Sequence, residues 1–324
     1  DAGHILGAAL ALVEIPFNRG EFLRIALAFD LGRRNLPLLH DPAQIQDVDV
    51  LISESTYGDR LHDNALNARE ELRGGIVRAL GRGGKVLIPT FALGRAQEIV
   101  YHLVHLRDRG EIPSVPVYVD SPMAQAIAGV FEKNADYLDD ESNALRGQVG
   151  SVVKPDWLTF TESVEESKSI TSSKQPSIVI AASGMCEHGR ILHHLKHGIE
   201  NEKNLVLLVG YQAENTLGRR IQNLEKNVRI FGDEFALKAE VQTLHAFSAH
   251  ADRLELFRYV RDAKPKKVFL VHGEQSQRES FARLLQEQLH LDVSLPANGE
   301  VVDLSSFISP PPSVQPPTPT SSPL

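Results

Sequence analysis

The sequence contains a single cysteine, Cys186, among 324 residues. One cysteine excludes an internal disulfide framework and a cysteine-rich zinc finger, and it is compatible with a reducing cytoplasm. We interpret Cys186 as a small buried residue and not as a nucleophile, because no motif supplies it with a partner. Any metal that this chain binds must therefore be held by histidine and carboxylate side chains.

Long apolar runs and an excess of positive charge are also missing. No run approaches the roughly 18 apolar residues that a membrane-spanning helix needs, so we expect no membrane contact. The run Ile5–Ile15 lacks the basic start of a signal peptide and is interrupted by Glu14. The formal net charge of −8 argues against a protein that coats nucleic acid with a broad basic surface, but it leaves room for a local basic groove.

The two ends of the chain differ from its middle. The sequence opens at Asp1 in a loop-like Asp-Ala-Gly-His, which suggests that residues are missing upstream. Residues 309–324 consist almost entirely of Pro, Ser and Thr, cannot bury a core, and are expected to be disordered. The length between them is enough for two domains or for one domain with an insertion.

Apolar strand-like runs alternate with helical periodicity along most of the chain. This alternation predicts a layered α/β fold with a largely parallel sheet. We expect strands over 21–29, 48–53, 85–89, 115–119, 177–182, 204–209, 228–231, 237–241, 267–271 and 291–294, and helices over 64–80, 93–106, from about 123, 187–197, from 252 and over 276–289. Residues 136–173 are polar and irregular, and Phe91 and Met123 are candidates for the core.

Histidines and carboxylates follow several of these strands. Asp30, Glu54 and His272 come directly after apolar runs, the stretch with His250 also stands at a strand end, and His4 lies in an early loop. Their side chains are of the types that zinc accepts without cysteine, so they suggest a metal or acid–base site. Spacing alone leaves plainer alternatives open, since Asp30 also fits a turn and His4 an ordinary loop histidine. His245, close to His250, is interpreted as a packing residue.

Two further positions are candidates for holding a phosphate. Ser183 follows a strand and precedes a helical pattern, so the N–H groups there could bind an anion. Arg95 has a similar place after Gly94, at the start of a predicted helix. A group of basic residues fits either phosphate contacts or a solvated helix face with some histidine packing: Arg190, His193, His194, Lys196 and His197.

Eight motifs occur in an order that is specific for one family. They are DAGHILGAA at 1–9, FDLGR at 29–33, ESTYGDR at 54–60, IPTFALGRAQE at 88–98, SGMCEHGRILHHLKH at 183–197, GYQAENTLGRR at 210–220, FSAHADR at 247–253 and VHGE at 271–274. The sequence resembles the β-CASP branch of the metallo-β-lactamase fold, which contains RNA-processing nucleases such as ribonuclease J and the cleavage subunit of the polyadenylation machinery.

This resemblance implies an α/β fold in which a β-CASP domain is inserted into the C-terminal part of a metallo-β-lactamase αββα sandwich. The β-CASP domain would cover residues 59–217, and the metallo-β-lactamase domain residues 1–58 and 218–308. The family's His-x-His-x-Asp-His motif, expected upstream of His4, does not occur in the 324 residues. We therefore expect an N-terminally truncated chain that lacks four ligands and whose own catalysis is impaired or absent.

The resemblance also assigns roles to five residues. The family's third and fourth metal motifs fall on His4 and Asp30, with Asp30 bridging two zinc ions, and motif C falls on His272, which would bind the second zinc. Motif A falls on Glu54 and motif B on His250. His250 would be the general acid, and Glu54 would orient it.

The implied activity is zinc-dependent hydrolysis of RNA phosphodiester bonds in RNA processing or degradation, with hydroxide from a dinuclear zinc site as the nucleophile. The motifs fit an endonuclease as well as an exonuclease. The expected partner is RNA, the expected location is the cytoplasm, and a homodimer is the candidate assembly. A non-catalytic RNA-binding scaffold of the same family and a small-ester metallo-hydrolase are the alternatives. The intact set of five residues favours an active parent, and the motifs between Ile88 and Arg220 argue against the ester hydrolase.

Overall fold

The structure of the protein is a computed structural model that describes residues 1–18, 20–62, 68–244 and 247–307. His245 and the tail predicted for 309–324 lie outside these residues. The chain divides into two compact units. The first unit comprises Asp1–Ala8, Gly32–Pro42 and Leu61–Ala251, and the second comprises Ala9–Leu31, Ala43–Arg60 and Asp252–Leu324.

The first unit is built on a six-stranded sheet in which every pairing is parallel. In spatial order the strands are β11 (Glu240–Leu244), β8 (Leu205–Val209), β4 (Val86–Pro89), β7 (Ile178–Ala181), β5 (Val117–Asp120) and β6 (Leu158–Phe160). All residues of β4, β7 and β8 are buried. Such continuous apolar strands are typical of a parallel sheet that is covered on both faces.

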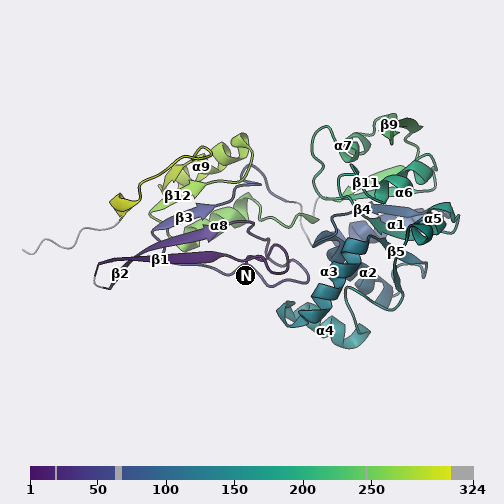
Figure 1. Cartoon of the computed structure of the whole chain (residues 1–324), viewed down its shortest axis with the longest axis horizontal. Coiled ribbons are helices and arrows are strands. Elements are labelled where there is room, and N and C mark those ends of the chain that lie inside the picture. Colours follow the sequence, from purple (N-terminus) through teal and green to yellow (C-terminus); the bar gives the residue numbers. More distant parts are fainter. Residues whose placement is uncertain (19, 63–67, 245–246, 308–324) are drawn as a thin grey trace, which may run out of the picture. The chain divides into compact units, whose positions relative to one another are not determined.

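Helices cover the two faces of this sheet. One face packs against α1 (Ala68–Gly81), α2 (Arg95–Asp108), α3 (Pro122–Lys133) and α4 (Asp140–Val149), and the other against α5 (Val164–Ser172), α6 (Ile191–Gly198) and α7 (Leu217–Gln222). Alternate residues of β4 face opposite cores, because Val86 and Ile88 pack on the first face and Leu87 on the second. Figure 1 shows α6 and α7 on one side of the sheet and α2 and α3 on the other. A two-stranded hairpin, β9 (Asn227–Ile230) and β10 (Asp233–Ala236), follows α7.

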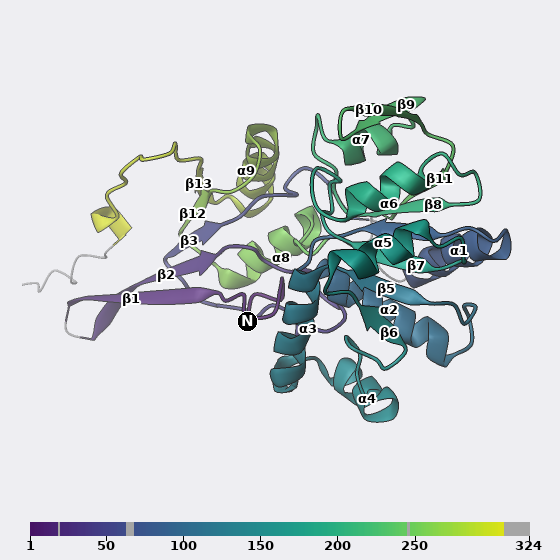
Figure 2. The same cartoon turned by 45° about the vertical axis from the view of Figure 1, so that its right-hand side comes forward.

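The second unit holds a five-stranded sheet in the order β1 (Ala11–Asn18), β2 (Glu21–Ala28), β3 (Val50–Ser53), β12 (Lys267–Leu270) and β13 (Asp292–Ser294). β1 and β2 form an antiparallel hairpin, and the remaining pairings are parallel (Figure 2). Two helices, α8 (Arg253–Ala263) and α9 (Gln275–Leu289), pack against each other. The helix predicted from 252 is α8, which begins at Arg253 because Asp252 caps it and forms a capping box with Glu255.

The alternation of strands and helices predicted from the sequence is confirmed, but β1, β10 and α7 were not predicted and three further regions need correction. Residues 136–173 are not irregular: they hold α4, β6 and α5. Asp139 caps α4, and Ser163 and Glu166 form a capping box at α5. These caps are visible in the sequence, so this region contained a signal that the periodicity did not reveal.

Two element boundaries were wrong. The helix predicted from residue 187 begins at Ile191, because Cys186 and Gly189 adopt left-handed backbone conformations (φ 60° and 80°) that a helix does not allow. In place of one strand over 237–241, the chain leaves β10 at Ala236 and enters β11 at Glu240. The connection is held by hydrogen bonds from the Lys238 and Ala239 N–H groups to the Ile199 carbonyl.

The two core candidates were also wrong, since Phe91 is 50% exposed and Met123 is 66% exposed. Each residue follows the carboxyl end of a parallel strand, where the chain leaves the sheet and burial ends. By contrast, Cys186 is fully buried as predicted, and burial raises the pKa of its thiol. No helix among the described residues combines the length and apolar character that a bilayer span requires.

Candidate functional site

Three of the predicted site residues lie at the same edge of the second unit's sheet. β2, β3 and β12 are adjacent and parallel, with Ala28 opposite Ser53 and Ser53 opposite Leu270. Asp30 follows β2 by two residues, Glu54 follows β3 directly, and His272 follows β12 by two residues. Because parallel strands in register end at one edge, the chain delivers the three side chains to the same place.

Asp30 and His272 are the exposed members of this group. Oδ1 of Asp30 lies 3.9 Å from Nδ1 of His272, and the two side chains are 52% and 58% exposed. Both residues have positive φ angles, 46° for Asp30 and 20° for His272. Left-handed backbone at a non-glycine residue costs free energy and is concentrated at functional sites.

Glu54 differs from them in being completely buried. Ser55, the next residue, ties its strand to that of His272. The Ser55 N–H donates to the His272 carbonyl oxygen at 2.8 Å, and the Ser55 hydroxyl donates to the same oxygen at 3.0 Å. Gly273 has φ 138°, and a Cβ atom there would lie 2.9 Å from the Ser55 hydroxyl, so this turn requires glycine.

The other two predicted residues, His4 and His250, meet in the first unit. Their ring centroids are 4.3 Å apart, and each ring offers a nitrogen within 4.8 Å of a nitrogen of the other. Both side chains are half-buried. The ring Nε2 of His62 donates to the carbonyl oxygen of His250 at 3.0 Å, which gives His62 a structural role.

The segment Gly32–Arg33 holds these two histidines in place. Gly32 forms an antiparallel bridge with His250, and the Arg33 N–H donates to the Ala249 carbonyl at 3.1 Å. On its other side, the Gly32 N–H donates to the Ala2 carbonyl at 2.7 Å. A Cβ atom on Gly32 would lie 1.9 Å from the Gly3 carbonyl oxygen, so the loop that carries His4 packs directly on a glycine.

Ser183 and Arg95, the two proposed phosphate contacts, belong to the first unit. Ser183 does not lie at a helix start, because α6 begins eight residues later; its hydroxyl accepts hydrogen bonds from the N–H groups of Glu187 and His188. Arg95 is at the start of α2 as predicted. Its side chain is 10% exposed, and its guanidinium pairs with Glu98 and lies 5.7 Å from the Phe247 ring centroid.

Sequence reasoning missed a buried carboxylate, Asp120, at the end of β5. Asp120 is fully buried and accepts hydrogen bonds from Arg190 at 2.7 Å, His194 at 2.6 Å, Ser167 at 2.6 Å and Thr161. Burial alone would raise the pKa of Asp120, but the four hydrogen bonds outweigh it and lower that pKa. An acid after an apolar strand was the signal used for Asp30 and Glu54, and the same signal was present here.

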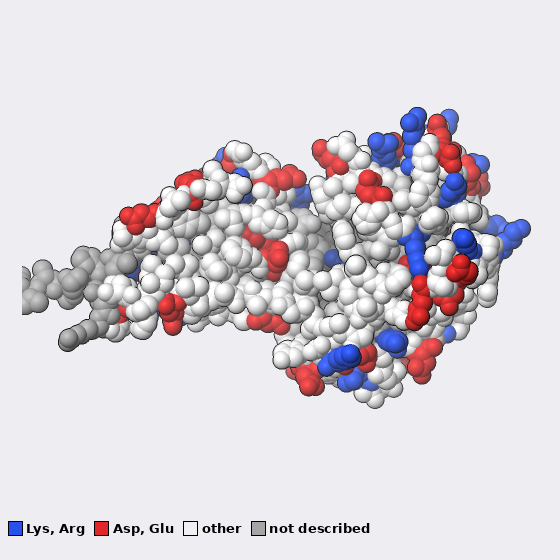
Figure 3. Space-filling model, viewed as in Figure 1, with Lys and Arg blue, Asp and Glu red and all other residues white. Residues whose placement is uncertain are grey.

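This network also engages part of the basic group on α6. His194 is 3% exposed and Arg190 pairs with Asp120, so neither lies on a free basic face. Lys196 pairs with Asp233 at 3.0 Å. On the face of the molecule seen in Figure 3, the coloured Lys and Arg residues are interspersed with Asp and Glu and form no broad basic surface.

Comparison with known proteins identifies the family. Residues 96–221 match the Beta-Casp domain, and residues 235–296 match the Zn-dependent metallo-hydrolase RNA specificity domain. The chain is 38% identical over 301 residues to Ribonuclease TTHA0252 of Thermus thermophilus, an alignment that covers 93% of this chain and 68% of the relative. The chain belongs to the β-CASP family of nucleases with the metallo-β-lactamase fold. The predicted α/β fold class is thereby confirmed.

Two further relatives match over a similar length of this chain. An RNase J-like protein of Methanocaldococcus jannaschii is 32% identical over 310 residues, which cover 94% of this chain and 70% of the relative. The transcription termination factor FttA of the same organism is 35% identical over 316 residues, covering 92% of this chain. The chain spans 48% of that factor's length.

The two domain matches contain only some of the site residues, because His4, Asp30, Glu54 and Arg95 lie outside both. Asp120 and Ser183 fall within the Beta-Casp match, and His250 and His272 within the metallo-hydrolase match. The compact units divide the chain differently from the predicted domains, because β9, β10 and β11 belong to the first unit. β11 completes the six-stranded sheet by pairing in register with β8. The domain limits 1–58, 59–217 and 218–308 remain a prediction.

Proposed function

We propose that this protein acts in the zinc-dependent hydrolysis of RNA phosphodiester bonds. The observation that carries the proposal is the delivery of Asp30, Glu54 and His272 to one sheet edge by three adjacent parallel strands. A bridging ligand, a buried acid and a further metal ligand are the groups that such a hydrolase needs. Membership of a nuclease family and the ribonuclease names of relatives support RNA as the substrate.

The donor atoms present fit zinc. Zinc takes imidazole nitrogen and carboxylate oxygen at about 2.0–2.2 Å, and two ligands of one ion lie roughly 3–4 Å apart at those bond lengths. The 3.9 Å between Asp30 and His272 agrees with this separation. We propose that Asp30, His272 and His4 would hold the metal. Bound zinc lowers the pKa of a coordinated water and neutralises the charge that grows on the phosphate.

Two residues of this chain are proposed to supply the proton that the leaving ribose oxygen takes up. His250 is proposed to hold a proton and deliver it to the ribose oxygen that leaves the phosphorus. Glu54 is proposed to orient the imidazole of His250 and to stabilise its cationic form, as a carboxylate does for other catalytic histidines. The complete burial of Glu54 supports this role, because a carboxylate out of water interacts more strongly with a cation.

Activity should depend on the metal. A protein loaded with zinc and supplied with a His-x-His-x-Asp-His segment should cleave labelled single-stranded RNA, and a chelator should abolish the cleavage. Zinc returned in excess should restore it. Cleavage that continues unchanged after the metal has been removed, as checked by mass spectrometry, would refute the proposal.

Replacement of Asp30 by asparagine should weaken zinc binding by at least about tenfold, because an amide binds zinc less well than a carboxylate. Mutation of residues that only hydrogen-bond to a metal ligand already lowers metal affinity by about 10- to 100-fold. Zinc titration followed by calorimetry measures the effect. Asp156→Asn is the matched control, since Asp156 is exposed and distant in sequence from every proposed ligand. Equal zinc affinity of Asp30→Asn and the control would remove Asp30 from the ligand set.

The 324 residues alone should bind fewer than two zinc ions and cleave RNA poorly. No His-x-His-x-Asp-His motif occurs among them, and tetrahedral zinc needs four ligands. Metal analysis of the purified chain measures the zinc content. Two zinc ions per chain together with RNA cleavage would contradict this expectation.

A non-catalytic role in RNA binding is the alternative, and the intact set His4, Asp30, Glu54, His250 and His272 favours the enzyme. RNA binding without cleavage by the zinc-loaded, motif-supplied protein would favour the scaffold. A cytoplasmic location and a homodimer remain predictions, as do the phosphate contacts of Arg95 and Ser183.

A further inference from the structure

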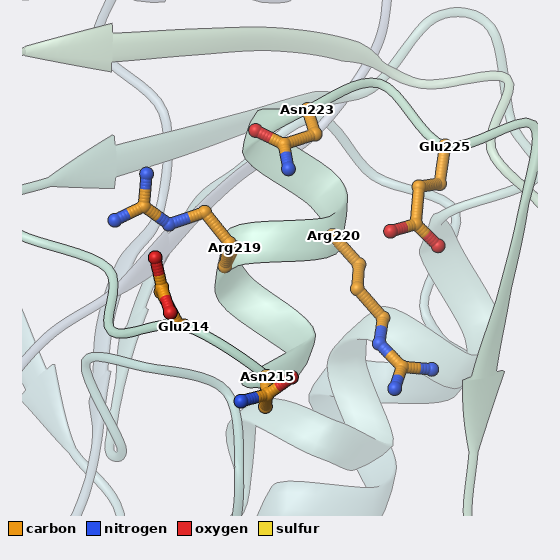
Figure 4. A pocket seen from close by; sticks show the side chains of 6 residues that line it. All are labelled: Glu214, Asn215, Arg219, Arg220, Asn223 and Glu225. Atoms are coloured by element: carbon orange, nitrogen blue, oxygen red, sulfur yellow. The ribbon is translucent and has the colours of Figure 1, made fainter.

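A pocket of about 570 Å³ lies beside α7 in the first unit. Six polar or charged residues line it (Figure 4): Glu214, Asn215, Arg219, Arg220, Asn223 and Glu225. They come from α7 and from the segments before and after it. None of them belongs to the proposed metal site, and the proposed chemistry of RNA cleavage leaves this pocket without a role.

The guanidinium N–H groups of the two arginines in the pocket are available as hydrogen-bond donors to a ligand. Within the described part of the chain, neither the Arg219 nor the Arg220 guanidinium hydrogen-bonds to an acceptor or pairs with a carboxylate, and Nε of Arg219 is buried without a partner. Other arginines of this unit are engaged: Arg190, for example, binds Asp120. Unsatisfied guanidinium donors that line a pocket are suited to a phosphate group.

An aromatic ring adjoins these donors. Tyr211 is 45% exposed, and the Arg219 guanidinium lies 5.5 Å from its ring centroid. Tyr211 comes two residues after the end of β8, at the sheet edge where α/β folds bind their ligands. A half-exposed ring beside a guanidinium offers a stacking surface for a nucleobase.

The backbone around the pocket is fixed before any ligand binds. The buried side chain of Gln212 donates to the Gly184 carbonyl at 3.0 Å, and the Gly218 N–H donates to the Met185 carbonyl at 3.0 Å. Thr216 caps α7 by accepting from the Arg219 N–H. A site that is already ordered loses less conformational entropy when it binds a ligand.

The pocket also presents acceptors, because Glu214 and Glu225 line it together with the two arginines. In Figure 4 the Arg219 guanidinium lies on the side of Glu214, and the Arg220 guanidinium points to the other side of α7. Two positive and two negative groups do not favour a bare anion. They match a molecule that combines a phosphate with hydroxyl donors, and a carboxylate is a common acceptor for ribose hydroxyls. The 2′-hydroxyl is also the group by which a protein distinguishes RNA from DNA.

We propose that this pocket is a subsite for one ribonucleotide of single-stranded RNA. Arg219 binds the phosphate of this nucleotide, Arg220 binds a neighbouring phosphate of the strand, and Tyr211 stacks on the base. Glu214 accepts a hydrogen bond from the ribose hydroxyl. This inference deepens the proposed function by adding a strand-binding site that is separate from the metal ligands.

The test measures binding of fluorescently labelled single-stranded RNA to the whole chain in the presence of a chelator, so that cleavage plays no part. Arg220→Gln should weaken binding about tenfold, as expected for one charge-assisted hydrogen bond, and should reduce the slope of affinity against salt by about one. Tyr211→Leu should weaken binding at least about fivefold, and Tyr211→Phe should keep it, because only the ring is needed for stacking.

Two further variants sharpen the test. Arg229→Gln removes the same charge from an exposed position on β9 outside the pocket and should leave binding unchanged. Glu214→Ala should reduce the preference for RNA over DNA of the same sequence. All variants should keep the melting temperature of the parent, which separates loss of contact from loss of fold.

The inference is overturned if Arg220→Gln and Tyr211→Leu bind RNA like Arg229→Gln, or if the chain does not bind RNA. The inference would also be overturned if an acidic peptide bound tightly at the pocket without weakening the binding of RNA. Competition separates the two sources of a ribonucleotide: a nucleoside monophosphate that competes as well as the oligonucleotide would indicate a free nucleotide instead of a strand.

Failure of the subsite and failure of the proposed function can be told apart. If the pocket variants bind normally while a His250 variant loses cleavage, only the subsite is wrong. If the pocket variants lose binding while the complete, zinc-loaded protein never cleaves RNA, only the catalytic proposal is wrong.

Discussion

Replacement of His250 by alanine should lower the rate of RNA cleavage by roughly two to four orders of magnitude, the usual contribution of a general acid. The proposed proton for the leaving ribose oxygen comes from this imidazole, and alanine cannot supply one. The measurement is single-turnover cleavage of labelled RNA by a zinc-loaded protein that also carries a His-x-His-x-Asp-His segment. The zinc content should stay the same as in the parent.

The zinc measurement is essential, because His250 lies next to a proposed ligand. Its ring centroid is 4.3 Å from that of His4, so an alternative role as a metal ligand has to be tested. A fall in zinc content that parallels the fall in rate would make His250 a ligand and not the acid. Normal turnover of His250→Ala would exclude both roles. His290→Ala, at an exposed position after α9, is the matched control and should retain full activity.

Replacement of Asp120 by asparagine should reduce the free energy of unfolding by about 3–5 kcal/mol, the cost of removing one partner of a buried ion pair. The carboxylate accepts from Arg190, His194, Ser167 and Thr161, and the amide would leave the Arg190 charge uncompensated. Urea denaturation of the first unit's transition measures the change. Asp156→Asn removes an exposed carboxylate and should shift stability by less than about 0.5 kcal/mol.

The same network predicts a dependence on pH. The pKa of Asp120 is lowered in the folded protein from its ordinary value of 3.8. Its stabilising contribution is therefore fully present above that ordinary value and is lost as the pH falls through the lower, folded pKa. The stability of the parent should fall in acid below about pH 4 more steeply than that of Asp120→Asn. Parallel acid unfolding curves for the two proteins would contradict this account.

The ends of β2, β3 and β12 show how much of the candidate site could be predicted from the sequence. Apolar runs followed by Asp30, Glu54 and His272 were visible as local patterns, because a buried strand must be apolar and must end where polar residues begin. The order of these strands in the sheet was not visible. It is set by pairings between residues far apart in the chain, such as Ser53 with Leu270.

The misplaced residues share a physical cause. Phe91 and Met123 look like core residues by type, but their positions just beyond a strand expose them. Asp120 and His194, which are 74 positions apart in sequence, are joined by one hydrogen bond, and no local pattern predicts such a pair. Propensity describes a residue and its near neighbours, whereas burial depends on which distant segments cover it.

The sequence by itself determined the family, the alternation of strands and helices, and the residue types available to a metal and a proton donor, since these follow from motifs and local periodicity. The tertiary structure decided which of them meet. Glycine at position 32 allows the loop that carries His4 to pack against the segment that pairs with His250. Ser55 joins the strand of Glu54 to that of His272. Contacts of this kind depend on the close packing of distant segments, which is a property of the folded chain.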